Sequence, residues 1–78
     1  MKPGDLGTDV KKLQEYLNRW GRKVRTNAPE LIKDGDYGPI TKQRVREFQE
    51  WATLDQTGVA NPITIGTLTA LVIPKNAP

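Results

Sequence analysis

Apolar side chains in the first third of the chain recur with the spacing of one helical face. They stand at i, i+3, i+7 and i+10, at Val10, Leu13, Leu17 and Trp20. Thr8 precedes this stripe and is a residue type that caps helix starts, and Asp9 suits the positive end of a helix. Gly21 follows the stripe, where a left-handed residue often ends a helix. We therefore predict a first helix with Thr8 as its N-cap and its end at Gly21.

Two further helices are predicted to start at prolines. Pro39 and Pro62 each precede an apolar stripe, and proline is favoured at the first helical position because the N–H that it lacks has no helical partner there. The first of these stripes consists of Thr41, Val45, Phe48 and Ala52, with Leu54 docking just after the helix end. The second stripe consists of Ile65, Leu68, Leu71 and Val72. Asn61 is a good cap for the last helix, and Pro74 ends it.

The rest of the chain has no regular period. Residues 22–33 are predicted to be a long loop, and no segment alternates as a strand would. A turn followed by a helix start occurs at Asp34–Thr41 and is echoed at Thr57–Thr64, which suggests an internal repeat. We expect an all-α fold: a small three-helix orthogonal bundle with long loops and an internal pseudo-repeat. The domain is predicted over residues 1–74, with a frayed tail over residues 75–78.

Composition narrows the classes of function. The 78 residues suffice for one domain, with 12 cationic and 9 anionic side chains and a net charge of +3. Cysteine, histidine and serine are absent, which removes disulfides, the usual zinc ligands and the usual nucleophilic triads. A glycosidase would need two carboxylates across a cleft, and so small a bundle offers no deep cleft. We therefore expect a protein that is not an enzyme and that uses no cofactor and no metal.

Charge and hydropathy argue against two kinds of partner. Basic residues run from Arg19 to Arg25 and from Lys42 to Arg46, but the overall charge is too balanced for a strong phosphate footprint. The 22–33 loop is also far longer than the turn of a helix-turn-helix protein, so a nucleic-acid module is kept only as an alternative. No apolar run is long enough to cross a bilayer, and no signal-peptide pattern follows Met1.

The turn at residues 34–41 carries the candidate chemistry. We expect positive φ at Gly35 and Gly38, which glycine adopts without a Cβ clash. Asp34 is expected to accept hydrogen bonds from the amides that follow it; a calcium loop is the lesser alternative, because further oxygen ligands are missing. Backbone amides that the turn leaves free, next to a helix start, would hold a carboxylate.

Three side chains of this region are candidates for ligand contact. Tyr37 is either a ring packed over the second helix with its hydroxyl at the surface, or the same half-exposed ring in contact with a ligand. Thr41 lies in the first helical turn, where it would cap locally. Arg44 follows one turn later and would hold a carboxylate bidentately if it pointed toward the same groove.

Two glutamines and two tryptophans have roles that the sequence leaves open. Gln14 and Gln49 each neighbour a core residue, and we favour a role in bracing loop backbone over ligand contact. Trp20 and Trp51 fit the edge of the core at helical spacing, and packing in the core or at its rim is favoured for both. An exposed tryptophan would instead be a good platform for a sugar ring.

Three motif blocks occur in order along the chain. They are Gly4-x-x-Gly7-x-x-Val10-x-x-Leu13-Gln14-x-x-Leu17-Asn18-x-x-Gly21, Asp34-Gly35-x-Tyr37-Gly38-Pro39-x-Thr41-x-x-x-Val45-x-x-Phe48-Gln49, and Gly58-Val59-x-x-Pro62-x-Thr64-x-x-x-Leu68. Together they resemble the bacterial peptidoglycan-binding domain of the three-helix type over nearly the whole chain. The chain departs from that pattern in its long 22–33 link, in Thr53 where the family favours glycine, and in a degenerate third block.

The resemblance implies a non-catalytic module that targets an attached hydrolase or phage lysin to peptidoglycan, in the cell wall or periplasm. Its implied partners are the stem peptide and the N-acetyl sugar, bound by a monomer. The implied ligand site consists of Asp34, Gly35, Tyr37, Gly38, Thr41 and Arg44. The alternative for the same fold is protein contact within a phage particle or a secretion assembly.

Overall fold

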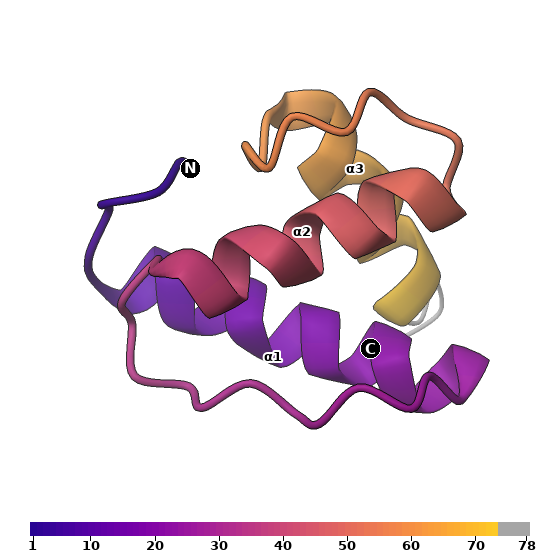
Figure 1. The fold of residues 1–78 in the computed structure, drawn as a ribbon, viewed down its shortest axis with the longest axis horizontal. Coiled ribbons are helices and arrows are strands. Elements are labelled where there is room, and N and C mark those ends of the chain that lie inside the picture. Colours follow the sequence, from indigo (N-terminus) through magenta and orange to yellow (C-terminus); the bar gives the residue numbers. More distant parts are fainter. Residues whose placement is uncertain (74–78) are drawn as a thin grey trace.

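The computed structural model describes residues 1–73, which contain three helices and no strand. The helices are α1 (Thr8–Val24), α2 (Pro39–Trp51) and α3 (Pro62–Val72), and α1 packs against both of the others (Figure 1). The predicted all-α bundle is therefore confirmed. The predicted helix stop at Pro74 and the predicted tail over residues 75–78 lie outside the described residues. No helix within residues 1–73 is long and apolar enough to span a membrane.

Both predicted ends of α1 were wrong. Its N-cap is Gly7, without a side-chain cap, and Thr8 is already helical. The helix continues through Gly21 to Val24 and ends at Arg25 in the left-handed conformation, with φ of 59°. The extra turn brings Val24 against the core, one heptad after Leu17, and this burial offsets the cost of about 1 kcal/mol for a glycine inside a helix.

The starts of α2 and α3 were predicted correctly. Both helices begin at a proline, Pro39 and Pro62. The Asn61 Oδ1 accepts a hydrogen bond from the Thr64 amide at 2.8 Å and so caps α3 as expected. Gly38 occupies the equivalent N-cap position of α2 and offers no side-chain cap.

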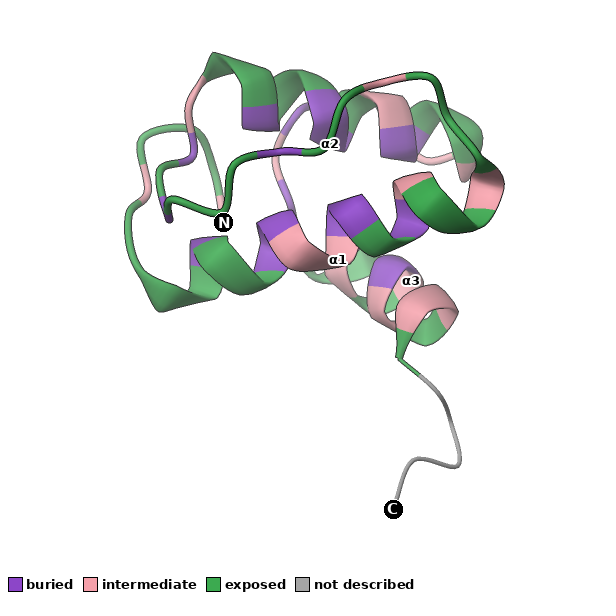
Figure 2. Cartoon of the chain, turned by 90° about the horizontal axis from the view of Figure 1, so that it is seen from below, coloured by how far each residue is buried: buried purple, intermediate pink, exposed green. Residues whose placement is uncertain are grey.

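The core lies where the three helices meet, and the buried positions of α1 and α2 face each other (Figure 2). Its buried apolar members are Val10, Leu13, Leu17, Trp20, Leu31, Tyr37, Val45, Phe48, Ala60 and Leu68. On α3 only Leu68 of the predicted apolar stripe is fully buried, and the other three members pack half-buried against the core. The predicted docking of Leu54 after α2 is also confirmed.

The long connection between α1 and α2 has a topological reason. Figure 1 shows that the two helices run in the same direction, so the chain must return along α1, about 25 Å for 17 residues, before α2 begins. Asn18 holds this return segment, because its side chain exchanges two hydrogen bonds with the backbone of Leu31, at 3.0 and 2.7 Å. The middle of the connection is therefore fixed to α1.

The N-terminal segment ties the two repeated turns together, which the sequence did not predict. The amides of Gly4 and Gly7 donate to the carbonyls of Tyr37 and Gly35, each at 2.9 Å. Met1 exchanges a further pair of backbone hydrogen bonds with Ala60, at 2.9 and 2.8 Å. Residues 1–7 thus bridge the first and the second turn.

Candidate functional site

The first turn is organised around the buried side chain of Gln14. Its Nε2 lies 3.1 Å from Asp34 Oδ1, 3.1 Å from the Asp36 carbonyl and 3.2 Å from Thr41 Oγ1. Its Oε1 accepts the Gly35 amide at 3.0 Å. The predicted bracing role of this glutamine is confirmed, and Thr41 is a buried partner in it rather than a local cap.

The second turn repeats this arrangement around Gln49. Its Nε2 donates to the Val59 carbonyl at 2.9 Å and to Thr64 Oγ1 at 3.0 Å, and its Oε1 accepts the Gly58 amide at 3.0 Å. Thr57 stands where the first turn has its aspartate, 3.4 Å from the same Nε2. The internal pseudo-repeat therefore extends to matched hydrogen bonds.

One of the two predicted positive-φ glycines has that geometry. Gly35 has φ of 77°, and a Cβ there would lie 2.9 Å from the Gly7 carbonyl oxygen. Gly38 is extended, with φ of −94°, so the prediction for it was wrong. The physical reason is its place as the N-cap of α2, where the backbone is usually in the β region.

The amides of residues 35–38 are not free, contrary to prediction. Gly35 donates to the glutamine as described, Asp36 donates to Asp34 Oδ1 at 2.9 Å, Tyr37 donates to the Asp5 carbonyl at 3.0 Å, and Gly38 donates to the Asp36 carbonyl at 2.9 Å. The expected turn-type role of Asp34 is thereby confirmed. The Asp36 amide, and after it the Gln14 side chain, hold the pKa of the Asp34 carboxyl below its usual range.

Tyr37 is buried, so its predicted half-exposed position was wrong. Only 1% of the residue is exposed, and its hydroxyl donates to the Gly58 carbonyl at 2.6 Å. The hydroxyl thus crosses from the first turn to the second instead of reaching solvent. Burial raises the pKa of Tyr37 to about 12.

A groove opens between residues 29–36 and the first turn of α2. Its volume is about 340 Å³, and four of the predicted site residues line it: Asp34, Gly38, Thr41 and Arg44. Gly35 and Tyr37 do not line it. The sequence reasoning missed two aliphatic members of the rim, Ile32 and Ile40, which are 79% and 71% exposed. Ile40 could have been noticed because it lies off the apolar stripe of its helix.

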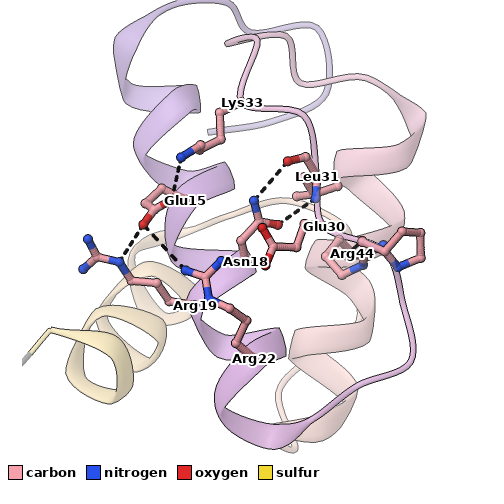
Figure 3. A network of polar contacts seen from close by, with 9 residues as sticks. Glu15, Asn18, Arg19, Arg22, Glu30, Leu31, Lys33 and Arg44 are labelled. Carbon is pink, nitrogen blue, oxygen red and sulfur yellow. Dashed lines mark hydrogen bonds and ion pairs between the residues drawn. The ribbon is translucent and has the colours of Figure 1, made fainter.

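The Arg44 side chain spans the space from α2 to the connection, as Figure 3 shows. Its Nη1 donates to the Pro29 carbonyl at 2.7 Å, and its Nε lies 2.9 Å from Glu47 Oε1 as an ion pair without hydrogen-bond geometry. The residue is buried and also lines the groove. Two of its nitrogens are thus engaged within the protein.

Most of the basic side chains near the groove are paired with carboxylates or carbonyls. Glu15 lies 3.0 Å from Lys33 and 2.7 Å from Arg19, and both contacts lower the pKa of its carboxyl (Figure 3). Arg22 pairs with Glu30 at 2.6 Å. Two of the four basic residues in the first basic run, Arg19 and Arg22, are therefore paired with carboxylates, which gives no support to the nucleic-acid alternative. Within residues 1–73, no cluster of His, Cys, Asp or Glu could hold a metal ion.

Comparison with known proteins identifies the family to which this architecture belongs. Residues 7–68 match the family model of the peptidoglycan binding domain. The chain is 38% identical over 72 residues to the carboxy-terminal processing protease CtpA of Bacillus subtilis (strain 168), a match that covers 92% of this chain and 13% of that protein.

A solved structure has the same fold. The crystal structure of the Burkholderia AP3 phage endolysin superposes with a TM-score of 0.75 and 32% identity, covering 100% of this chain and 27% of that one. The chain therefore spans only a small part of each of these relatives. Since the family model covers most of the sequence and both relatives contain the same unit, the chain belongs to the peptidoglycan binding domain family.

Proposed function

We propose that the protein is a non-catalytic module that holds an attached hydrolase or phage lysin on peptidoglycan, in the cell wall or periplasm. The observation that carries this proposal is the groove at the first turn, which combines an uncapped helix start, a buried arginine and an aliphatic rim. Membership of the family supports the wall polymer as the partner. Tethering raises the local concentration of substrate, so a weak affinity for one site suffices.

The groove suits the stem peptide of the wall polymer. A stem peptide carries small apolar side chains together with carboxylates, and it would be bound with the adjoining N-acetyl sugar. Ile32 and Ile40 would contact the apolar groups, while the positive start of α2 would attract a carboxylate. Arg44 is already paired with Glu47 and with the Pro29 carbonyl, so it would reach the ligand only through its remaining nitrogen, Nη2. Asp34 and Thr41 line the same groove and would contribute polar contacts.

Gly35 and Tyr37 have a supporting part in this proposal. The first permits the left-handed turn, and the second holds the turn against Gly58. We expect the module to act as a monomer, with each chain providing one groove.

A pull-down with purified peptidoglycan sacculi tests the proposal. The wild-type domain should pellet with sacculi at low salt, and the double variant Ile32→Ala, Ile40→Ala should be retained at least fivefold less well. Both side chains are exposed, so the variant should keep its fold. Ile63→Ala is the matched control, because Ile63 stands at the equivalent position of the second repeat and is 68% exposed.

None of these substitutions changes the net charge of +3, so non-specific electrostatic retention is equal in all of them. A wild-type domain that stays in the supernatant at low salt would contradict the proposed function. Equal retention of the double variant and the control would reject the groove as the contact surface.

A further inference from the structure

A second hollow lies at the other end of α2 and plays no part in the groove described above. It measures about 450 Å³ and is lined by Trp20, Thr26, Asn27, Ala28, Glu47, Glu50 and Trp51. Trp51 is the last residue of α2 and is 49% exposed, so the predicted rim position holds for it, while Trp20 is buried.

The indole of Trp51 packs against two buried aromatic rings. The ring of Phe48 lies 6.1 Å from it at an interplanar angle of 29°, so a stacked neighbour covers one face. Trp20 meets it edge-on, with centroids 5.9 Å apart. Both neighbours are buried, at 0% and 3% exposure, so the exposed half of Trp51 is a flat apolar surface on a fixed support.

Polar groups surround this surface. Glu50 has no ion-pair partner within residues 1–73, Glu47 is already paired with Arg44, and Asn27 provides an amide. The indole N–H of Trp20, in the wall of the same hollow, is buried and has no acceptor among the described residues. The carboxylates offer acceptors and the Asn27 amide offers a donor around an apolar face, whereas the Trp20 N–H lies beneath the surface.

We propose that the Trp51 hollow binds a pyranose ring of the glycan strand. A pyranose presents C–H groups on its face and hydroxyls at its edge, which matches a flat indole with carboxylates and an amide beside it. A compact ammonium group would have only Glu50 as an unpaired carboxylate, because Glu47 is already paired with Arg44, and it would leave the amide of Asn27 without a partner. This inference rests on the proposed function and assigns the sugar to a site apart from the peptide groove.

The test uses a chitin trisaccharide, a neutral oligomer of N-acetylglucosamine without a stem peptide. It is titrated into the 78-residue domain while tryptophan fluorescence and the two indole N–H resonances are followed. We expect saturable changes at Trp51 and Trp20, at sugar concentrations on the order of millimolar for a single weak site. Trp51→Ala should weaken binding by about fivefold or more, Trp51→Phe by less, and Ile63→Ala not at all.

Trp51→Phe keeps an aromatic ring on Phe48 and so separates loss of the platform from loss of the fold. Glu50→Gln should weaken binding about twofold without a change in thermal midpoint. The inference is overturned if the trisaccharide moves neither indole resonance. It is also overturned if Trp51→Ala binds the sugar as wild type does, or if a simple alkylammonium ion moves Trp51 where the sugar does not.

The sacculi assay keeps the two proposals distinguishable. Wild-type binding to sacculi without any response to the trisaccharide leaves the wall-binding function standing and removes the glycan site. A saturable response to the trisaccharide without binding to sacculi leaves the sugar site standing and removes the wall-binding function.

Discussion

Gly38→Asn separates the binding role of the α2 start from its structural role. In the second repeat, Asn61 Oδ1 accepts the Thr64 amide and closes the start of α3. In the first repeat the equivalent position is Gly38, so the Thr41 amide has no side-chain acceptor. An asparagine at position 38 would make the same cap, because the backbone there is already extended and a Cβ would meet nothing within 4 Å.

The substitution should have opposite effects on stability and on binding. Asparagine in place of glycine at an N-cap stabilises by only a few tenths of a kcal/mol, so the thermal midpoint should rise by about 1–3 °C. The new side chain would occupy the Thr41 amide at the start of α2, where we propose that a ligand carboxylate binds. Losing a charge-assisted contact at a helix start should cost about 1–2 kcal/mol of binding, or roughly five- to thirtyfold in affinity.

The assay is binding of the domain to purified sacculi across a concentration series, with thermal melts of the same samples. Asn61→Gly is the matched control: it removes the cap of α3, should lower the midpoint slightly, and should leave binding unchanged. If Gly38→Asn is more stable and binds as well as wild type, the start of α2 does not contact the ligand. A fall in both stability and binding would mean instead that the substituted turn is distorted.

Three further predictions concern the turns themselves. Gln14→Glu should destabilise more than Gln49→Glu in neutral denaturant titrations, because only the former places a carboxylate beside Asp34. The wild-type pKa of Asp34 is lowered, so its stabilising contribution is present above about pH 4 and is lost as the pH falls through its folded pKa. In Gln14→Glu the neighbouring carboxylate raises the pKa of the pair, so the gap between the two variants should begin to close at a higher pH, as one carboxyl of the pair takes up a proton. Thr53→Gly should raise the thermal midpoint by about 4–8 °C, since Thr53 has φ of 61° and relief of a left-handed β-branched residue is worth about 1 kcal/mol. Tyr37 has a pKa raised to about 12, so wild-type stability should fall between about pH 10 and 12, and Tyr37→Phe should lack this part of the alkaline decline in denaturant midpoints.

Local sequence signals predicted the fold well where one residue decides the geometry. Pro39, Pro62 and Asn61 placed the starts of two helices because a proline without an N–H and a short polar cap act within one turn of chain. Gly21 misled the prediction of the α1 end because the burial of Val24, a tertiary contact, outweighs the cost of a helical glycine. At Thr53 the family pattern, which favours glycine, was the better guide. The backbone there has φ of 61°, a conformation that glycine adopts more readily than threonine.

The site was harder to predict because its walls come from distant segments. The exposure of Tyr37 depends on Gly58, 21 residues away, which no periodicity reveals. The turn amides were predicted to be free because one of their acceptors, the Asp5 carbonyl, lies in an N-terminal segment whose position cannot be predicted from its sequence pattern. Residues that line the groove through their helix, such as Arg44, were correctly placed because helical spacing fixes their direction.

The comparison of the two repeats separates the residues that build the turn from those available for binding. Both copies contain a glutamine, a glycine and a threonine at matching positions. These residues make the same hydrogen bonds in each copy, which explains why they recur. The copies differ where a ligand would meet the chain: Asn61 closes the start of α3, whereas Gly38 leaves the start of α2 open beside Arg44. A turn can therefore keep its fold-defining residues in both copies while only the first retains an open helix start, and this difference locates the proposed peptide site at the first copy.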